Sequence, residues 1–428
     1  MRIAIVGSGI SGLAAAWLLA KRHAVTLFEA EQRLGGHTHS VDVALGGLRY
    51  PVDTGFLVFN ERTYPNLTAL FAMLEIPIAK SDMSFSVSLE EPRVEWAGSN
   101  LDTLFAQRRN LLRPKFLGML ADILRFNREA ARAANAKSQR PLGEFLERGR
   151  YGTAFRDWYL LPMAAAIWSC PTRTMLDYPF ASFARFFRNH GLLELAGRPQ
   201  WLTVVGGARR YVERMARDLP DVRLGSPVVR VRRDASGVRV GREHFDALVL
   251  ACHSDQALAI LGEGAASAER AVLGAISYQK NRAILHTDAA LLPRQRRAWS
   301  AWNYSAGRDT PDGRPVAVHY LINRLQPLPF ADPVIVSLNP HRTPDASRVL
   351  AEFDYEHPVF DSDACAAQGA LESLQGAQRT WFCGAWTRYG FHEDGLGSAL
   401  AVARAFGVEA PWRADSPLPA AEAEREAA

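Results

Sequence analysis

The chain has 428 residues, of which 48% are hydrophobic and 22% are charged, and its net charge is +5. This length exceeds what a single hydrophobic core usually serves, so two domains are expected. A small positive charge without a recognised nucleic-acid-binding motif argues against nucleic acid as a partner. Four scattered cysteines without a CxxC pair predict neither a disulfide framework nor a zinc site.

The N-terminal residues carry a dinucleotide-binding pattern. Residues 2–6 (RIAIV) form an apolar run that leads directly into GSGISG. In this pattern Gly7 permits the tight turn from strand to helix, Gly9 lets the backbone approach a pyrophosphate, and Gly12 lets the helix pack on the strand. The following helix, LAAAWLLAKR, points its N-terminal amides towards the phosphates. We therefore predict dinucleotide binding at this turn.

A second apolar run, HAVTLF, ends at Glu29, which Ala30 follows. Its distance from the glycines is close to the spacing of about twenty residues at which an acidic side chain reaches the ribose hydroxyls. Because a carboxylate at this place disfavours a 2′-phosphate, NADP is not expected. These residues do not distinguish FAD from NAD as the bound dinucleotide.

Three further motifs narrow the choice. EAEQRLGGHTHS contains Arg33 and the glycine pair 35–36, which indicates a second close approach of the backbone to a ligand. Residues 52–56 read VDTGF. Near the other end of the chain, RTWFCGAW and GFHEDGLGSALAVARAFG predict a strand, a turn at Gly384 and a helix. The dipole of such a helix would stabilise negative charge at its N-terminus.

Together these motifs resemble those of the FAD-containing amine oxidase superfamily, which includes amine oxidases, phytoene-type desaturases and protoporphyrinogen oxidase. The resemblance implies an α/β fold, in which a Rossmann-like FAD-binding domain of the glutathione-reductase type is interleaved with an α+β substrate domain. We expect an FAD-binding domain of residues 1–60, 201–270 and 376–410, a substrate domain of residues 61–200 and 271–375, and a disordered tail of residues 411–428.

The resemblance also implies particular cofactor contacts. His37 lies where relatives place an arginine against the FAD phosphates, and the residue matching Val228 packs its backbone on the adenine. Asp394 either caps the closing helix or binds a cofactor hydroxyl. Some relatives attach the flavin through a cysteine after the closing strand, whereas this chain reads GAWTRYGFHEDG there, so FAD is expected to be non-covalent. The predicted contacts are Gly7, Gly9, Ser11, Gly12, Glu29, Ala30, Gly35, Gly36, His37, Asp53, Thr54, Gly55, Phe56, Val228, Gly384, Glu393, Asp394, Gly395 and Leu396.

Aromatic residues are dense between the motifs, in FRDWYLLPMAAAIWSCP, YPFASFARFFRNHGLL and WSAWNY. Most of them are expected to be core, but Trp168, together with Trp386 and Tyr389 near the closing helix, could line an apolar chamber. We assign no catalytic acid or base, because hydride transfer to a flavin needs little acid–base machinery. His37 and His39 lack further ligands at suitable spacing, so no metal site is expected.

Residues 101–128 interleave leucines with Arg108, Arg109, Arg113 and Lys115. This basic amphipathic pattern is typical of a solvated helix face, and also of a helix that lies on an anionic lipid surface. The chain opens on strand-like residues without a cationic, apolar leader, and no run reaches the apolar length of a membrane span. We therefore expect a cytoplasmic protein, with peripheral contact to the inner face of the membrane as an alternative.

These patterns predict an FAD-dependent oxidoreductase that transfers a hydride from a C–H bond of a lipid or isoprenoid-like substrate to the flavin. Oxygen or a membrane quinone would reoxidise the cofactor, because no second GxGxxG for NAD(P)H is present. Amine oxidation is the alternative within this class. A redox-neutral flavin isomerase and a non-catalytic binding protein are the alternatives from other classes.

Overall fold

A five-stranded parallel sheet holds the N-terminal glycine turn in the computed structural model, which describes residues 1–134, 140–168, 172, 174–194, 197–307 and 317–412. The strand order is β19-β13-β1-β2-β9, and every neighbouring pair is parallel. The strands are β1 (Arg2–Val6), β2 (Ala24–Phe28), β9 (Val222–Arg223), β13 (Ala247–Leu250) and β19 (Thr380–Phe382). All five come from the ranges predicted for the FAD-binding domain, whose boundaries stay a prediction.

Helices cover both faces of this sheet, which explains why its strands are continuous apolar runs. Ile3 and Ile5 of β1 point to one core, and Ala4 and Val6 point to another. The first core contains residues of α1 (Ile10–Leu19), α9 (Arg209–Ala216) and α14 (His392–Ala405). The second contains residues of α10 (Ser254–Leu261), α11 (Ser267–Leu273) and α13 (Ser362–Ala370). The predicted α/β class is therefore confirmed.

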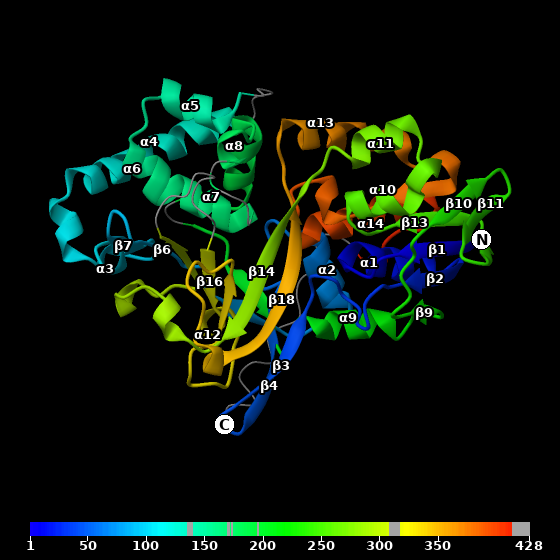
Figure 1. Ribbon diagram of the computed structural model, residues 1–428, viewed down its shortest axis with the longest axis horizontal. Coiled ribbons are helices and arrows are strands. Elements are labelled where there is room, and N and C mark those ends of the chain that lie inside the picture. The colour runs from blue at the N-terminus through cyan, green and yellow to red at the C-terminus, as the bar shows by residue number, and fades with distance from the viewer. Residues whose placement is uncertain (135–139, 169–171, 173, 195–196, 308–316, 413–428) are drawn as a thin grey trace.

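A seven-stranded mixed sheet forms the other half of the molecule, with the order β18-β14-β17-β16-β15-β6-β7. Only β15 and β6 run parallel within it. Its strands are β6 (Phe85–Leu89), β7 (Val94–Ala97), β14 (Tyr278–His286), β15 (Trp302–Ala306), β16 (Ala317–Leu321), β17 (Ile335–Leu338) and β18 (Val349–Pro358). Figure 1 shows the long strands β14 and β18 side by side between the two halves of the molecule.

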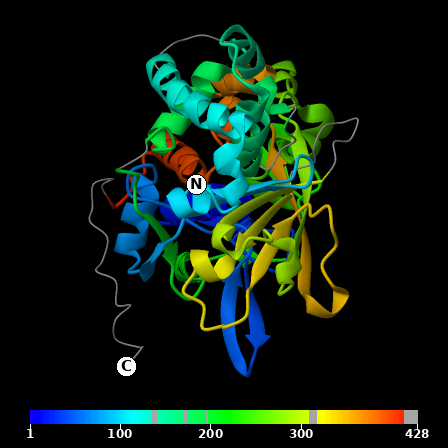
Figure 2. The ribbon, with the colours of Figure 1, turned by 90° about the vertical axis from the view of Figure 1, so that its left-hand side faces the viewer.

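A helical layer packs on this sheet and shares its largest core. Its members are α3 (Leu101–Leu104), α4 (Pro114–Ala133), α5 (Leu142–Arg148), α6 (Thr153–Phe155), α7 (Leu161–Trp168) and α8 (Phe180–Asn189). A 3-10 turn, Arg108–Leu112, joins α3 to α4, and one π turn, Arg156–Leu160, joins α6 to α7. Figure 2 shows these helices, in cyan and green, above the strands.

Smaller elements complete the fold. The hairpin of β3 (Ser40–Leu45) and β4 (Leu48–Asp53), in blue, projects below the molecule in Figure 2. The remaining elements are α2 (Pro65–Met73), β5 (Ile78–Ser81), β8 (Trp201–Val204), β10 (Val231–Asp234), β11 (Gly237–Val240), β12 (Glu243–Phe245) and α12 (Ile322–Leu325). Strands β10 and β11 form an antiparallel hairpin, in which Asp234 pairs with Gly237.

The expected tail is described only at its start, since residues 413–428 lie outside the described part of the chain. Trp412 is buried, and its ring centroid lies 6.3 Å from that of Trp17 in α1. The tail prediction is thus too long at its N-terminal edge, because the Trp412 side chain has a hydrophobic partner. Among the described residues, no helix combines the length and the apolar composition needed to cross a membrane.

Candidate active site

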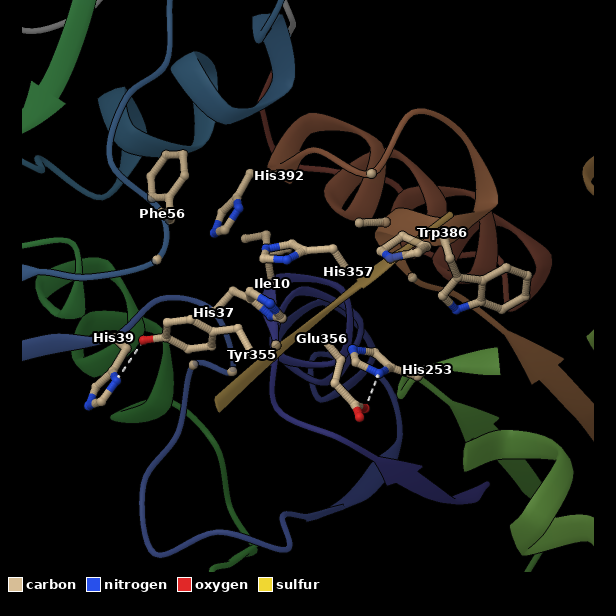
Figure 3. A pocket seen from close by; sticks show the side chains of 18 of the residues that line it. Ile10, His37, His39, Phe56, His253, Tyr355, Glu356, His357, Trp386 and His392 are labelled. Atoms are coloured by element: carbon tan, nitrogen blue, oxygen red, sulfur yellow. Dashed lines mark hydrogen bonds and ion pairs between the residues drawn. The ribbon is translucent and has the colours of Figure 1, made fainter. Parts of the chain in front are cut away.

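A cavity of about 1370 Å³ runs between the parallel sheet and the seven-stranded sheet. We call the part beside the parallel sheet its nucleotide end, which contains Gly9 and Glu29, and the part beside α7 and β17 its apolar end, which contains Ile167 and Leu338. Strands β14 and β18 also contribute lining residues. Figure 3 shows side chains that line this cavity.

The glycine turn leaves open space where a ligand would lie. Gly7 has a φ of +99°, a conformation that favours glycine, and a Cβ at Gly12 would lie 1.8 Å from the carbonyl oxygen of Gly7. A Cβ at Gly9 would meet no protein atom within 4 Å. Gly7 and Gly12 therefore bring strand and helix together, while Gly9 faces the cavity with its backbone open to a pyrophosphate.

Glu29 is held at the end of β2. Its carboxylate accepts hydrogen bonds from the backbone N–H of Ser8 at 2.9 Å and the Ser8 hydroxyl at 2.5 Å. It also accepts the backbone N–H of Glu31 at 2.9 Å. The backbone N–H of Ser226 donates to the Glu29 carbonyl at 2.8 Å, which brings the chain leading to Val228 to the same edge. Glu29, Ala30 and Val228 all line the cavity.

The loop after Glu29 packs on the glycine turn. A Cβ at Gly36 would lie 3.1 Å from the Cα of Gly9, and a Cβ at Gly55 would lie 2.1 Å from the carbonyl oxygen of His37. These close approaches place residues 35–37 and 54–56 along one wall of the cavity. The Nε2 atom of His37 is buried and has no hydrogen-bond partner among the described residues.

Imidazole rings cluster along this wall (Figure 3). The ring centroids of His37 and His357 lie 5.2 Å apart, and so do those of His37 and Tyr355. His392 stacks on Phe56 with centroids 3.8 Å apart, and its Nε2 lies 2.9 Å from the Thr38 hydroxyl. Burial lowers the pKa of His357 to about 4 and that of His392 to about 3, and it holds the pKa of His37 well below its ordinary value. These rings are neutral at physiological pH.

The start of the closing helix differs in part from the expectation. The Asp394 carboxylate accepts the backbone N–H of Phe391 at 3.0 Å and caps α14, and burial raises its pKa to about 7. The Glu393 carboxylate instead accepts the backbone N–H groups of Asn66 and Leu67, at 3.0 and 2.9 Å, and so caps α2. Neither carboxylate is among the residues that line the cavity.

Other predicted contacts are packing residues. A Cβ at Gly395 would lie 2.8 Å from side-chain atoms of both Ile10 and Ser11, so this glycine lets α14 approach α1. Leu396 is fully buried in the core around α1. Ser11 and Gly384 line the cavity, whereas Gly12, Gly395 and Leu396 do not.

Asp53 also lies behind the cavity wall. Its carboxylate accepts the backbone N–H of Ala208 at 3.0 Å, the side-chain amide of Gln326 at 2.6 Å and the hydroxyl of Ser40. Burial raises the pKa of Asp53 to about 7. The side chain joins β4, α9 and the residue after α12, and so supports the Thr54–Phe56 wall from behind.

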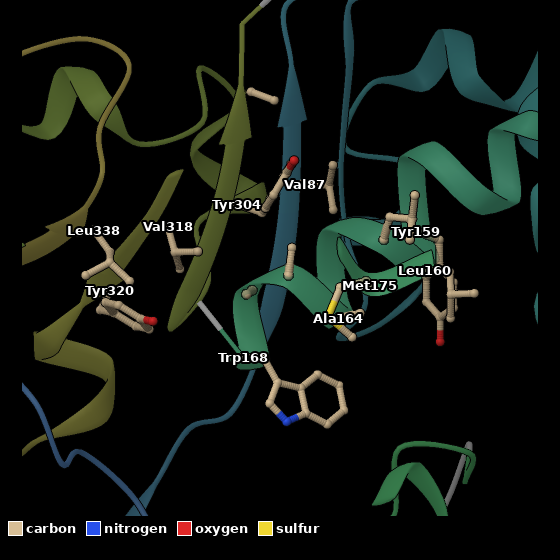
Figure 4. Close-up of a cluster of buried hydrophobic side chains, with 14 of the residues drawn as sticks. Val87, Tyr159, Leu160, Ala164, Trp168, Met175, Tyr304, Val318, Tyr320 and Leu338 are labelled. Carbon is tan, nitrogen blue, oxygen red and sulfur yellow. The ribbon is translucent and has the colours of Figure 1, made fainter. Parts of the chain in front are cut away.

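The apolar end is lined by side chains from distant segments. Its lining residues are Met83, Ile167, Phe186, Leu192, Trp201, Trp302, Tyr320, Val336 and Leu338. Figure 4 shows the neighbouring core, in which Trp168 lies below α7 while Tyr320 and Leu338 come from the strands opposite. The sequence alone does not identify Ile167 or Leu338, because nothing local distinguishes a cavity residue from a core residue.

Of the three aromatic residues predicted for the substrate pocket, one lines the cavity. Trp386 lines it, but its indole N–H donates to the carbonyl oxygen of Cys252 at 3.1 Å within the core of the parallel sheet. Trp168 and Tyr389 both pack on Phe186, with ring centroids 4.6 and 5.7 Å away, and neither is a lining residue.

Residues of β18 were missed by motif analysis. Tyr355 and His357 line the cavity, and Asp354 and Glu356 of the same strand also line it. Ser8, which holds Glu29, lies within GSGISG and was also not singled out. Alternation along β18 gave no signal, because residues of both parities reach the cavity.

The fold and the cavity define a dinucleotide-binding enzyme with a separate substrate sheet. The open space at Gly9 and the unpartnered Nε2 of His37 fit FAD, whose pyrophosphate needs backbone and side-chain donors. The family model of flavin-containing amine oxidoreductases matches residues 10–295, and the chain belongs to this family. It is accordingly an FAD-dependent oxidoreductase.

Individual relatives are more distant. The carotenoid phi-ring synthase of Chlorobaculum tepidum is 28% identical over 178 residues, which cover 38% of this chain and 27% of that protein. The chain thus spans about a quarter of that relative's length. The structure of a CLA-producing fatty acid isomerase from P. acnes is similar with a TM-score of 0.66 and 18% identity, covering 95% of this chain and 98% of the other.

An amine-oxidising enzyme shares the fold to the same extent. Cyclohexylamine oxidase from Brevibacterium oxydans IH-35A is similar with a TM-score of 0.64 and 16% identity, covering 95% of this chain and 99% of that one. At these identities the structural likeness concerns the fold. It confirms the parallel-sheet flavoprotein architecture that the motifs predict.

Proposed function

We propose that the enzyme dehydrogenates an apolar chain, lipid or isoprenoid-like, by removing a hydride and a proton from adjacent carbons and leaving a double bond. The observation that carries this proposal is the apolar end of the cavity, where aliphatic and aromatic side chains of the helical layer face those of the seven-stranded sheet. Bound FAD would accept the hydride with the electron pair of its C–H bond, and the proton from the adjacent carbon would be released to bulk water.

The residues at this end bind and orient rather than react. The side chains of Ile167, Val336 and Leu338 offer dispersion contacts along an extended hydrocarbon and exclude water from it. An ammonium group would need a carboxylate or an aromatic cage. The carboxylates that line the cavity are those of Glu29, Glu31, Asp354 and Glu356, and none of them is among the residues of the apolar end named above. The aliphatic side chains of that end favour a hydrocarbon, whereas its aromatic rings keep amine oxidation as the competing proposal.

The nucleotide end would hold the cofactor. Within this proposal Gly9 and Gly36 approach the pyrophosphate, the Glu29 carboxylate binds the ribose, and His37 donates to a phosphate from its Nε2 atom. Val228 packs on the adenine. The FAD is non-covalent, because the cavity residues after Gly384 include no cysteine.

The names of two relatives support the same substrate class. A carotenoid and a fatty acid, which appear in the names of the C. tepidum and P. acnes proteins, are both largely hydrocarbon. Cyclohexylamine, in the name of the third, supports amine oxidation as the competing proposal.

The test is anaerobic reduction of the purified holoenzyme by candidate substrates, followed through the flavin absorbance. Bleaching by a fatty acyl or polyene lipid, with a new double bond in the product, supports the proposal. Bleaching by amines alone overturns it in favour of amine oxidation. Double-bond migration without net bleaching identifies a redox-neutral isomerase. Acid precipitation that leaves the flavin in solution confirms non-covalent attachment, and yellow precipitate contradicts it.

A further inference from the structure

Residues 101–124 form an exposed apolar ridge, made of Leu101, Leu111, Leu112, Leu117 and Leu124. Their exposed fractions are 74, 48, 88, 46 and 49%. Five of the ten exposed large hydrophobic side chains in the described part of the chain thus lie in this one stretch. Single exposed leucines are ordinary on protein surfaces, whereas several within one short segment indicate a contact site.

The geometry of α4 shows that the ridge is not part of the core. Phe116, Met119 and Phe126 form the buried face of the helix. Leu117 and Leu124 are seven residues apart, so they lie on one stripe, and exposed Ala121 lies between them on that stripe. The first turns of the helix are therefore apolar on both faces, and the outward face has no protein partner that the structure describes.

Basic side chains border the ridge. Arg108, Arg109 and Lys115 are exposed, and Arg109 and Arg113 donate to the carbonyl oxygen of Arg93 at 2.8 and 3.0 Å. Asp102, the one exposed carboxylate in this stretch, accepts from Arg108 and Arg297. No ion pair is formed by Arg109 or Lys115 with any described residue. Arg93, Arg108 and Arg109 also line a second cavity of about 790 Å³, together with Glu90, Glu91 and Glu95.

We propose that the apolar ridge and its arginines and lysine are a docking surface for a bilayer that contains anionic phospholipid. The leucines enter the interfacial layer, and Arg109 and Lys115 meet lipid phosphates. A symmetric dimer through the same patch would bring Arg109 and Lys115 of both copies together, and this repulsion disfavours a second copy as the occupant. Figure 1 shows α3 at the end of the molecule opposite β1 and β2, where a planar surface can reach it.

The exposure and charge of this surface do not depend on the substrate, so the proposed membrane docking holds whether or not the substrate is a lipid. The experiment is co-sedimentation of the full-length holoenzyme with vesicles of phosphatidylcholine, with or without phosphatidylglycerol. We expect binding to the phosphatidylglycerol vesicles that weakens as salt is added, and much weaker binding to phosphatidylcholine alone.

Paired variants separate the two contributions. Leu111→Ser with Leu112→Ser, and separately Arg109→Glu with Lys115→Glu, should each lower the vesicle partition coefficient by about tenfold or more. The matched control is Leu48→Ser with Leu350→Ser, which changes two exposed side chains elsewhere, at 50 and 39%, neither of which lines the cavity. This control should bind as the unchanged protein does.

Three results overturn the proposal. The first is absence of binding to either vesicle, and the second is an equal loss of binding in the ridge and control variants. The third is a dimer in solution that Leu111→Ser with Leu112→Ser dissociates, which would make the ridge a contact between copies. Flavin content and melting temperature, measured on every variant, show that the fold and the cofactor site are intact.

Discussion

The two ends of the cavity are built in opposite ways. At the nucleotide end the wall is largely backbone: a Cβ at Gly12 would lie 1.8 Å from the Gly7 carbonyl oxygen, a Cβ at Gly36 would lie 3.1 Å from the Gly9 Cα, and Glu29 is held by three donors from neighbouring loops. At the apolar end the wall is side chain, with Ile167 from a helix facing Leu338 from a strand. Backbone walls tolerate almost no added atom, whereas side-chain walls can repack. Substitutions in the wall of the nucleotide end should therefore be poorly tolerated, whereas the apolar end should accommodate substitutions by repacking.

The largest effect is expected from Gly12→Ala. The new Cβ would lie 1.8 Å from the Gly7 carbonyl oxygen. Because a backbone oxygen and a Cβ fixed to the backbone cannot rotate away, the clash can be relieved only if α1 moves away from β1. We expect loss of soluble, flavin-containing protein, measured as yield and flavin content. Gly118→Ala in α4, where a Cβ meets nothing within 4 Å, is the control and should be neutral. Normal flavin content in Gly12→Ala would contradict the packing role.

Gly9→Ala should affect FAD binding without affecting the packing of the protein. A Cβ there meets no protein atom within 4 Å. The free energy of unfolding of the apoprotein, followed through its melting temperature, should therefore change by no more than about 0.5 kcal/mol. FAD affinity should fall by about tenfold or more, because the methyl group occupies the approach to the pyrophosphate. Titration of apoprotein with FAD measures this. Unchanged affinity would mean that the cofactor does not approach Gly9.

At the apolar end, Ile167→Gln should change catalysis without affecting the cofactor. Ile167 is half-buried and lines the cavity, so the amide would lower kcat/KM for an apolar chain by about tenfold, the range typical of a changed contact in a hydrophobic pocket. Flavin content should stay normal. Met163→Gln, one turn earlier in α7 and outside the lining, is the control. An equal effect of both variants would assign the loss to α7 stability instead.

A chain of hydrogen bonds in the seven-stranded sheet fixes the tautomers of two buried histidines. The backbone N–H of Asp288 donates to Nδ1 of His286 at 3.0 Å, so the proton of this ring is on Nε2, 2.7 Å from the Ser337 hydroxyl. Ser337 must then donate to Nδ1 of His319 at 2.6 Å, which leaves the His319 Nε2–H to donate to Ser305 at 2.7 Å. Every group in the chain is satisfied while both rings are neutral.

These hydrogen bonds predict that acid destabilises the seven-stranded sheet. Burial lowers the pKa of His286 to about 4 and that of His319 to about 3, below the ordinary value of 6.5. The unfolded chain therefore binds more protons below pH 6.5, and the free energy of unfolding should fall as the pH decreases from there towards 4, by up to about 1.4 kcal/mol per unit of separation for each ring. Thermal unfolding at several pH values measures this.

Ser337→Ala tests the same chain at neutral pH. It leaves one nitrogen on each ring unpartnered, which should cost about 1–3 kcal/mol of unfolding free energy. Ser86→Ala, in the same sheet, is the control, because its hydroxyl bonds Asn303 Oδ1, which still accepts the Ser300 N–H. The control should lose less unfolding free energy. Equal losses in the two variants would show that the hydrogen bonds of Ser337 to the two histidines contribute no more to stability than the Ser86 hydrogen bond.

The smallest effect is expected from Glu393→Ala. Loss of the cap on α2 should lower stability by about 1 kcal/mol, which denaturant unfolding can measure. FAD affinity should be unchanged, in contrast to Gly9→Ala. A selective loss of FAD affinity would return Glu393 to the cofactor contacts that the motif predicts.

Motif analysis succeeded where function depends on backbone conformation. The turn at Gly7, the packing role of Gly12 and the Asp394 cap all depend on residues near in sequence or on direct helix–strand contact, so residue type and spacing indicate them. It failed to separate Glu393 from Asp394, because adjacent helical residues point in different directions and only the position of α2 shows which of them finds a partner. The roles of Trp386 and Tyr389 were undetermined for the same reason.

The sequence by itself determined the parallel-sheet flavoprotein fold, the glycine turn, the acid at the end of β2 and the closing helix. Only the tertiary structure decided which of many aromatic and aliphatic side chains line the cavity, that Asp53 supports a wall rather than facing it, and that the leucines of residues 101–124 stay exposed. The physical reason is range: backbone turns and caps are set by near neighbours, whereas a cavity wall is defined by the relative placement of segments that are hundreds of residues apart.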